Sequence, residues 1–188
     1  MNEIVTYLDR LRAVAMDQYG FVTTAQAVDA GVARPELAKM VARDRIERVA
    51  HGVYRIPQVP QTQYDAFMLA VLWTGAPEAC LGHETALMLR ELSDINPTSI
   101  HVCVGKRRRI KRVGGIGYIL HNEDIAPQCI TWFKEIPIVD TPTAIEQCIF
   151  DGVPGYLIEQ AMETASKTSE LTKIEREGLT RMLEERDA

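Results

Sequence analysis

The chain lacks several features that would fix its class at once. No run of about 18 or more apolar residues occurs among its 188 residues, which excludes an ordinary transmembrane helix. The first residues show no basic stretch followed by an apolar one, so we expect no secretory signal. Walker A, G-x-S-x-G and G-x-G-x-x-G motifs are all missing. The sequence therefore predicts no membrane partner and no common nucleotide or nucleophile site.

Cysteine is scarce and dispersed, and no two cysteines form a C-x-x-C pair. The four are Cys80, Cys103, Cys129 and Cys148. Their apolar surroundings indicate reduced, mostly buried thiols in a cytoplasmic protein. A zinc site could be drawn from Cys80-x-x-His83 and His101-x-Cys103, but neither pair has the usual knuckle spacing. We predict no metal and no cofactor.

Basic residues are fewer than acidic ones, which gives a net charge of −5, but the charge is unevenly distributed along the chain. Residues 1–57 carry a net +1, residues 58–105 carry −4, residues 106–112 carry +6, and residues 113–188 carry −8. An approaching polyanion feels local potential, because salt screens charges beyond about 8 Å. The acidic total therefore does not exclude nucleic acid.

The segment from Gly20 to Pro57 contains the most informative pattern. A preceding helix over residues 2–18 is indicated by its apolar spacing. Thr23 or Thr24 is a suitable N-cap for a second helix, and Pro35 lies where a third helix would begin. Two short apolar and basic strands then surround a tight His51-Gly52 turn. Two helices followed by a β-hairpin are typical of a winged helix-turn-helix.

Several polar residues of this segment lie where DNA would be contacted. Arg34, near the start of the third helix, can bond guanine bidentately in the major groove. Lys39 and Arg43 suit phosphates, as do the hydroxyl and N–H groups at the start of the second helix. Residues 33–55 hold six Lys or Arg against three Asp or Glu. The predicted contacts of this segment are Thr23, Thr24, Arg34, Lys39, Arg43, Arg48, His51 and Arg55.

The rest of the chain predicts a second domain of mixed character. The sequence predicts a helix from Tyr64, a helix over 85–92, and strands over 99–104, 117–121, 130–133 and 136–139. Three C-terminal helices follow. We predict an α+β fold in which a winged helix-turn-helix DNA-binding domain, residues 1–57, precedes a mixed α/β domain, residues 63–188.

A basic run, KRRRIKR at residues 106–112, lies between two predicted strands, which places it on an exposed hairpin turn. Its cations could bind phosphates of DNA or RNA. Six such contacts would make the logarithm of the binding constant fall with the logarithm of salt concentration at a slope of about −5. A solubilising loop or a contact with the acidic C-terminal region is the alternative. The cations are Lys106, Arg107, Arg108, Arg109, Lys111 and Arg112.

The sequence gives less support to a catalytic function than to DNA binding. His83 and Glu84 are adjacent on a predicted helix and would not face each other. Four acidic residues could in principle hold a metal in a nuclease, but none has metal-ligand spacing. They are Glu84, Glu91, Asp94 and Asp140. We predict that the protein is not an enzyme.

The sequence resembles the AbiEi family, the antitoxins of AbiE-type (type IV) toxin–antitoxin systems. The matching N-terminal segments are Gly20–Thr23, Gly31–Arg34 with Leu37, and Arg45–Arg55. In the second domain, Gly82–Leu87 with Leu92-Ser93 is similar to the family's SHESAL…LS type segment, although Gly82 stands where Ser is usual. Ile100–Val102 and Ile136–Pro142 fit the same pattern.

This resemblance implies a function. The protein would repress its own operon by binding operator DNA, an inverted repeat, as a dimer or as two cooperating monomers. Its C-terminal antitoxin domain would counter a nucleotidyltransferase toxin, without a tight complex being implied. The alternatives are a generic winged-helix regulator, a nucleic-acid-processing enzyme, and an interaction module whose winged helix binds a toxin directly.

Overall fold

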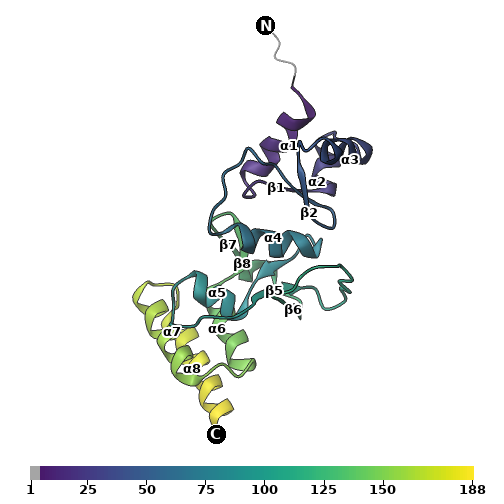
Figure 1. The fold of residues 1–188 in the computed structure, drawn as a ribbon. Coiled ribbons are helices and arrows are strands. Elements are labelled where there is room, and N and C mark those ends of the chain that lie inside the picture. The colour runs from purple at the N-terminus through teal and green to yellow at the C-terminus, as the bar shows by residue number, and fades with distance from the viewer. Residues whose placement is uncertain (1–4) are drawn as a thin grey trace. The chain divides into compact units, whose positions relative to one another are not determined.

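A computed structural model describes residues 5–188 and confirms the α+β class. The chain forms two compact units (Figure 1). Unit 1 comprises the chain up to Pro77 together with Arg109–Ile116. Unit 2 comprises Glu78–Arg108 and Gly117–Ala188. No helix among the described residues is long and apolar enough to cross a membrane.

The helices of unit 1 are α1 (Tyr7–Met16), α2 (Thr24–Asp29), α3 (Arg34–Ala42) and α4 (Asp65–Thr74). The first is shorter than the predicted helix over 2–18, of which residues 2–4 lie outside the described residues. Capping boxes begin α1 and α2, and a proline in the first turn begins α3. The two helices of the predicted helix-turn-helix therefore begin where their capping residues indicate.

The sheet of unit 1 is antiparallel with the strand order β1-β3-β2. Its strands are β1 (Phe21–Thr23), β2 (Glu47–Ala50) and β3 (Val53–Arg55). The hairpin β2–β3 was expected, whereas β1 was not. The helices and the sheet enclose one apolar core, whose buried members are Leu11, Ala15, Val22, Ala27, Val32, Leu37, Ile46 and Ile56.

Helix α4 is part of unit 1, although the sequence predicts a second domain from residue 63. Asp65, at the start of α4, pairs with Arg55 of β3 at 2.7 Å. The indole Nε1 of Trp73 donates to the carbonyl oxygen of Val113 at 3.2 Å. These contacts tie α4 and residues 109–116 to the hairpin, so the division between compact units does not coincide with the predicted boundary.

Unit 2 is built on a five-stranded sheet of order β6-β5-β4-β8-β7. Its strands are β4 (Cys80–Leu81), β5 (Ile100–Val104), β6 (Tyr118–Asn122), β7 (Ile130–Phe133) and β8 (Ile136–Val139). Strands β5 and β6 are parallel. The predicted hairpin turn at residues 106–112 is therefore wrong, because consecutive parallel strands need a crossover connection.

The helices of unit 2 are α5 (His83–Leu89), α6 (Thr141–Phe150), α7 (Gly155–Lys167) and α8 (Lys173–Asp187), and a 3₁₀ turn covers Pro127–Cys129. Helix α6 packs against the other three. The carboxylate of Asp140 accepts from the backbone N–H of Thr143 at 3.0 Å and caps α6. This packing places the end of α6 beside the start of α5 and the strands β5 and β6.

Candidate nucleic-acid interface

Helices α2 and α3, the two helices of the predicted helix-turn-helix, are held together by apolar contacts. Thr23 caps α2, and a short turn from Ala30 to Ala33 leads into α3. Ala27 of α2, Val32 of the turn and Leu37 of α3 are all fully buried in the core of unit 1. Because Leu37 faces inward, the residues on the opposite side of α3 are presented to solvent.

Cations lie at both ends of α3 and, at Lys39, on its exposed side. Arg34, Lys39 and Arg43 are all exposed. The ammonium of Lys39 lies 2.7 Å from the carboxylate of Glu36, and its side chain is 58% exposed. A surface pair of this kind contributes about 0–1 kcal/mol, so Lys39 can exchange Glu36 for a phosphate at little cost. The predicted contacts on α3 are therefore accessible.

The hairpin β2–β3 presents two further predicted contacts. Arg48 on β2 and His51 at the turn are exposed. Gly52 has φ +69°, a conformation that favours glycine, and its carbonyl accepts from the backbone N–H of Thr24 at 2.8 Å. This bond holds the turn of the hairpin against the first residue of α2.

Arg55 is a correction to the predicted interface. Its side chain is buried, with the residue only 7% exposed. The guanidinium donates to Asp65 Oδ2 at 2.7 Å, to the carbonyl of Tyr19 at 3.2 Å and to that of Val59 at 3.1 Å. With its donors committed inside unit 1, Arg55 is a structural residue and not a DNA contact.

The two threonines are also committed internally. The Thr23 hydroxyl accepts from the backbone N–H of Gln26 at 3.2 Å, and its own N–H donates to Gln26 Oε1 at 2.9 Å. The hydroxyl of Thr24 donates to the carbonyl of Gly52 at 3.3 Å. These groups build the start of α2 and its contact with the hairpin, so their predicted role as phosphate donors loses its main support.

The basic run at residues 106–112 is partly neutralised. Arg108 makes a bidentate contact with Glu78, at 2.7 and 2.8 Å, which holds the pKa of that carboxyl at about 2. Arg112 donates to the carbonyls of His51 at 3.1 Å and Trp73 at 2.8 Å. The run also spans the division between the units, since residues 109–112 belong to unit 1.

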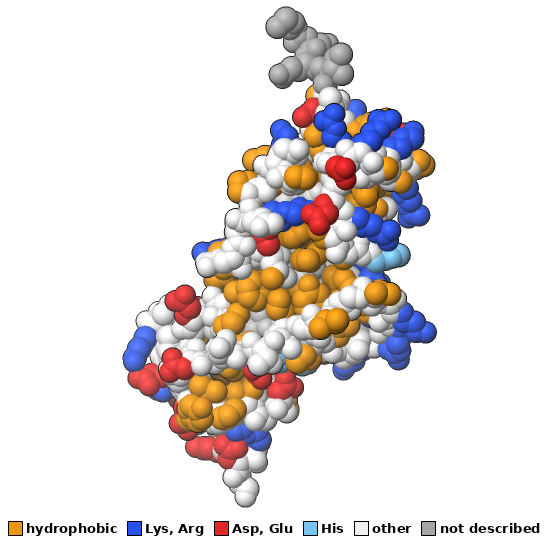
Figure 2. All heavy atoms as spheres, in the orientation of Figure 1, with side chains coloured by type: hydrophobic (Ala, Val, Ile, Leu, Met, Phe, Trp, Pro, Cys, Tyr) orange, Lys and Arg blue, Asp and Glu red, His pale blue; other side chains and the backbone are white. Residues whose placement is uncertain are grey.

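Charge is segregated on the visible face. Figure 2 shows Lys and Arg side chains over α3 of unit 1 and mainly Asp and Glu over α7 and α8 of unit 2. The acidic total of the sequence thus arises largely outside the helix-turn-helix, as the segment charges predict.

Neither the His83–Glu84 pair nor the acidic metal site considered for a nuclease is present as such in unit 2. Glu84 is not the partner of His83, whose ring nitrogens lie 2.7 Å from Asp151 Oδ2 and 2.7 Å from Glu123 Oε1. The four acidic residues considered for a nuclease belong to neither of the clusters of potential metal ligands among residues 5–188. Asp140 among them is committed as the cap of α6.

His83 and His101, which the sequence analysis considered for a zinc site together with Cys80 and Cys103, do come close together, but His121, Asp151 and Glu123 were not predicted beside them. One cluster adds His121 and Asp151 to them, and a second joins His83 to Cys103 and Glu123. A signal existed for His121, since it ends the predicted strand directly after the one that carries His101. Asp151, the residue after α6, has no such signal.

Residues 9–57 match a family model described as "Transcriptional regulator, AbiEi antitoxin". This confirms the predicted resemblance over the helix-turn-helix and the hairpin, and it indicates a transcriptional regulator of the antitoxin type. No curated protein matches the chain. Among solved structures, the crystal structure of the RV2827C protein from Mycobacterium tuberculosis is similar with 12% identity and a TM-score of 0.45, over 94% of this chain and 81% of that one.

Proposed function

We propose that the protein is an antitoxin and transcriptional autorepressor of a type IV toxin–antitoxin operon. It binds operator DNA through α3 and the β2–β3 hairpin, and it counteracts a nucleotidyltransferase toxin. The observation that carries the proposal is the set of exposed cations on α3 and directly after it, inside the segment that matches the regulator family.

The exposed residues make different kinds of contact with DNA in this proposal. Arg34, at the N-terminal end of α3, reads a guanine edge in the major groove, as recognition helices do. Lys39 and Arg43 neutralise phosphates beside it, and Arg48 and His51 contact the backbone or minor groove from the hairpin. The operator is an inverted repeat bound by a dimer or by two cooperating monomers, because symmetric half-sites are the usual route to specificity.

The test is a binding measurement on the protein's own promoter by mobility shift and fluorescence anisotropy. Arg34→Ala is expected to weaken operator binding by about 1–3 kcal/mol and to leave binding to unrelated DNA nearly unchanged. Lys39→Ala weakens binding to both DNAs alike, because a phosphate contact carries no sequence information. Arg181→Ala removes an exposed cation from α8 of unit 2 and serves as the matched control.

Absence of a shift at low salt, or equal shifts for wild type, Arg34→Ala and Lys39→Ala, contradicts the mechanism. Antitoxicity is tested separately: the reading frames that flank this gene are sequenced, and a nucleotidyltransferase found there is co-expressed with the protein. Wild type and Arg34→Ala are both expected to restore growth, because the repressor surface lies in unit 1 and the antitoxin function is assigned to the C-terminal domain. Stable co-purification of the two proteins would favour direct toxin binding instead.

A further inference from the structure

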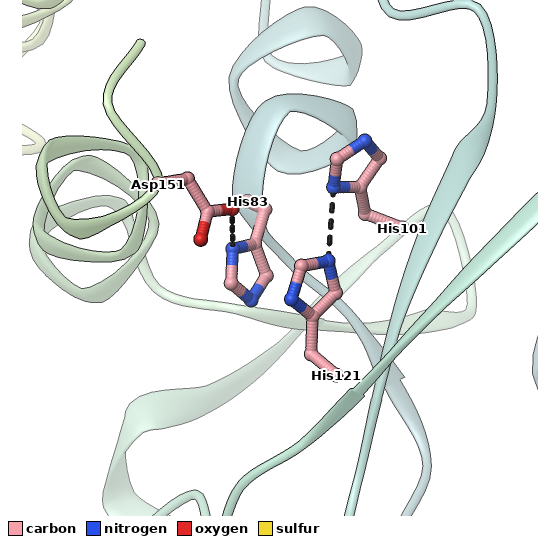
Figure 3. A group of neighbouring side chains, drawn as sticks. All are labelled: His83, His101, His121 and Asp151. Atoms are coloured by element: carbon pink, nitrogen blue, oxygen red, sulfur yellow. Dashed lines mark hydrogen bonds and ion pairs between the residues drawn. The ribbon is translucent and has the colours of Figure 1, made fainter.

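Unit 2 holds a group of three histidines and one aspartate that the proposed function does not use, named here the histidine cluster: His83, His101, His121 and Asp151. Four separate elements supply its members. His83 begins α5, His101 lies on β5, His121 lies on β6, and Asp151 follows the last residue of α6. Figure 3 shows the three rings and the carboxylate converging from these elements.

The pairing of β5 with β6 brings two of the rings together. The strands are parallel, and His121 lies opposite Cys103, two residues beyond His101. Residues two apart on a strand share a face, so His101 and His121 point to the same side of the sheet. Their rings meet, with His121 Nε2 at 3.0 Å from His101 Nδ1 (Figure 3).

The third ring completes the cluster. His83 stacks on His121, with ring centroids 3.4 Å apart and planes 19° apart. One ligand atom from each of the four cluster residues lies within 4.8 Å of the others. Tetrahedral ligands at zinc distances are about 3.4 Å apart, so an ion requires inward movements of about 1 Å or a little more. Rotations about side-chain bonds supply movements of that size.

The charges around His83 call for a cation. Both nitrogens of His83 lie 2.7 Å from carboxylate oxygens, of Asp151 and of Glu123. These two carboxylates place negative charge beside the rings, which an ion held by the cluster would offset. His83 binds such an ion through a nitrogen that gives up its carboxylate contact.

The surrounding residues hold His83 in place. Gln147 accepts from its backbone N–H at 2.8 Å and donates to Glu123 at 2.8 Å. His83 itself has φ +53°, a left-handed conformation that is costly for a residue with a side chain. The hydroxyl of Thr85 accepts from the backbone N–H of His101 at 2.9 Å. These bonds fix the backbone at two of the histidines that carry the rings.

We propose that the histidine cluster binds one divalent transition-metal ion of the zinc type. Imidazole nitrogen with one carboxylate is a donor set that zinc favours, and calcium and magnesium favour oxygen alone. Asp151 is the fourth ligand, and its carboxylate, 33% exposed, gives the ion a path from solvent. With four protein ligands the site is closed, so the ion is structural and joins α5, β5, β6 and the end of α6.

The experiment uses the full chain without a histidine tag, stripped of metal by a chelator and then titrated with Zn²⁺ against a chromophoric competitor. One ion per chain is expected. His121→Ala is expected to weaken binding by at least about 100-fold, and Asp151→Asn by about 10-fold. His51→Ala removes the remaining histidine, which lies in unit 1, and binds zinc as wild type does. Co²⁺ in place of Zn²⁺ gives strong visible absorption with wild type and loses it with His121→Ala.

Circular dichroism of each metal-free variant establishes that it is folded. If His121→Ala does not fold, Asp151→Asn decides, because its side chain is partly exposed and keeps its size. The proposal is overturned if folded wild type takes up no zinc at micromolar concentration. It is equally overturned if a folded cluster variant, His121→Ala or Asp151→Asn, binds zinc with the affinity of His51→Ala.

Discussion

Glycine is required at position 82 by the lack of space around it. The backbone there does not require it, because it is extended, with φ −152°, and suits any residue. A Cβ at this position would lie 2.5 Å from Cys103 Sγ and 2.9 Å from Gln147 Oε1. Cys103 and Gln147 are themselves buried. A serine here would collide with the Cys103 thiol.

We therefore predict that Gly82→Ala lowers the free energy of unfolding by about 1–3 kcal/mol, the usual cost of overpacking. Gly178→Ala is the matched control. It lies inside α8 with nothing within 4 Å of the added Cβ, so it should raise stability by about 0.5–1 kcal/mol. Urea unfolding followed by circular dichroism measures both.

A second pair of variants isolates the cause. In the Cys103→Ala background the colliding sulfur is gone, so Gly82→Ala should cost clearly less than in wild type. An undiminished cost in that background would show that the Cys103 contact is not the reason for glycine.

At the scale of elements, the buried pair of Arg55 and Asp65 connects β3 to α4. Both side chains are mostly buried, at 8% and 16% exposure. Removing one partner of such a pair leaves an uncompensated charge, which typically costs about 3–5 kcal/mol. Arg55→Ala should therefore lower the free energy of unfolding of unit 1 by about that amount. The fluorescence of Trp73, which lies in the same unit, reports this unfolding.

Arg48→Ala, an exposed position on the neighbouring strand, is the control and should stay within about 0.5 kcal/mol of wild type. The double variant Arg55→Ala with Asp65→Ala should cost less than the sum of the two single changes, because neither charge is then left unpaired. Additive costs would contradict the pair as the reason for the burial of Arg55.

Local signals predicted most of the elements. The starts of α2 and α3 follow from Thr23 and Pro35, and β7 and β8 have the bounds that their apolar runs indicate. Elements whose existence depends on distant partners were missed or misjudged. Strand β1 is three residues that are strand only because they pair with β3. The parallel pairing of β5 with β6 leaves no mark in either strand, so a hairpin was expected.

In the candidate site too, features set by local sequence were predicted, and features that depend on distant residues were not. The exposure of Lys39 and Arg43 follows from helical spacing, because the apolar side of the helix identifies the opposite one. The burial of Arg55 could not be predicted, since its partners Tyr19, Val59 and Asp65 come from three other places in the chain. The histidine cluster was missed for the same reason, because four elements supply its ligands.

At the scale of the whole molecule, an acidic protein is proposed to bind a polyanion, so local positive charge must supply the attraction. The basic run at residues 106–112 is the densest source of it, with six cations. The expected slope of about −5 assumed that all six meet phosphates. Arg108 and Arg112 are engaged with Glu78 and with backbone carbonyls, so the run supports a shallower dependence.

The double substitution Arg107→Gln with Lys111→Gln tests the contribution of this run. Both residues are exposed, and if each meets a phosphate the log–log salt slope of promoter binding becomes shallower by about 1.8. Fluorescence anisotropy between about 50 and 200 mM salt measures the slope. Lys173→Gln with Arg181→Gln makes the same change in net charge on α8 and should leave the slope unaltered. If both double variants keep the wild-type slope, Arg107 and Lys111 do not meet phosphates, and the two exposed cations tested here supply none of the attraction.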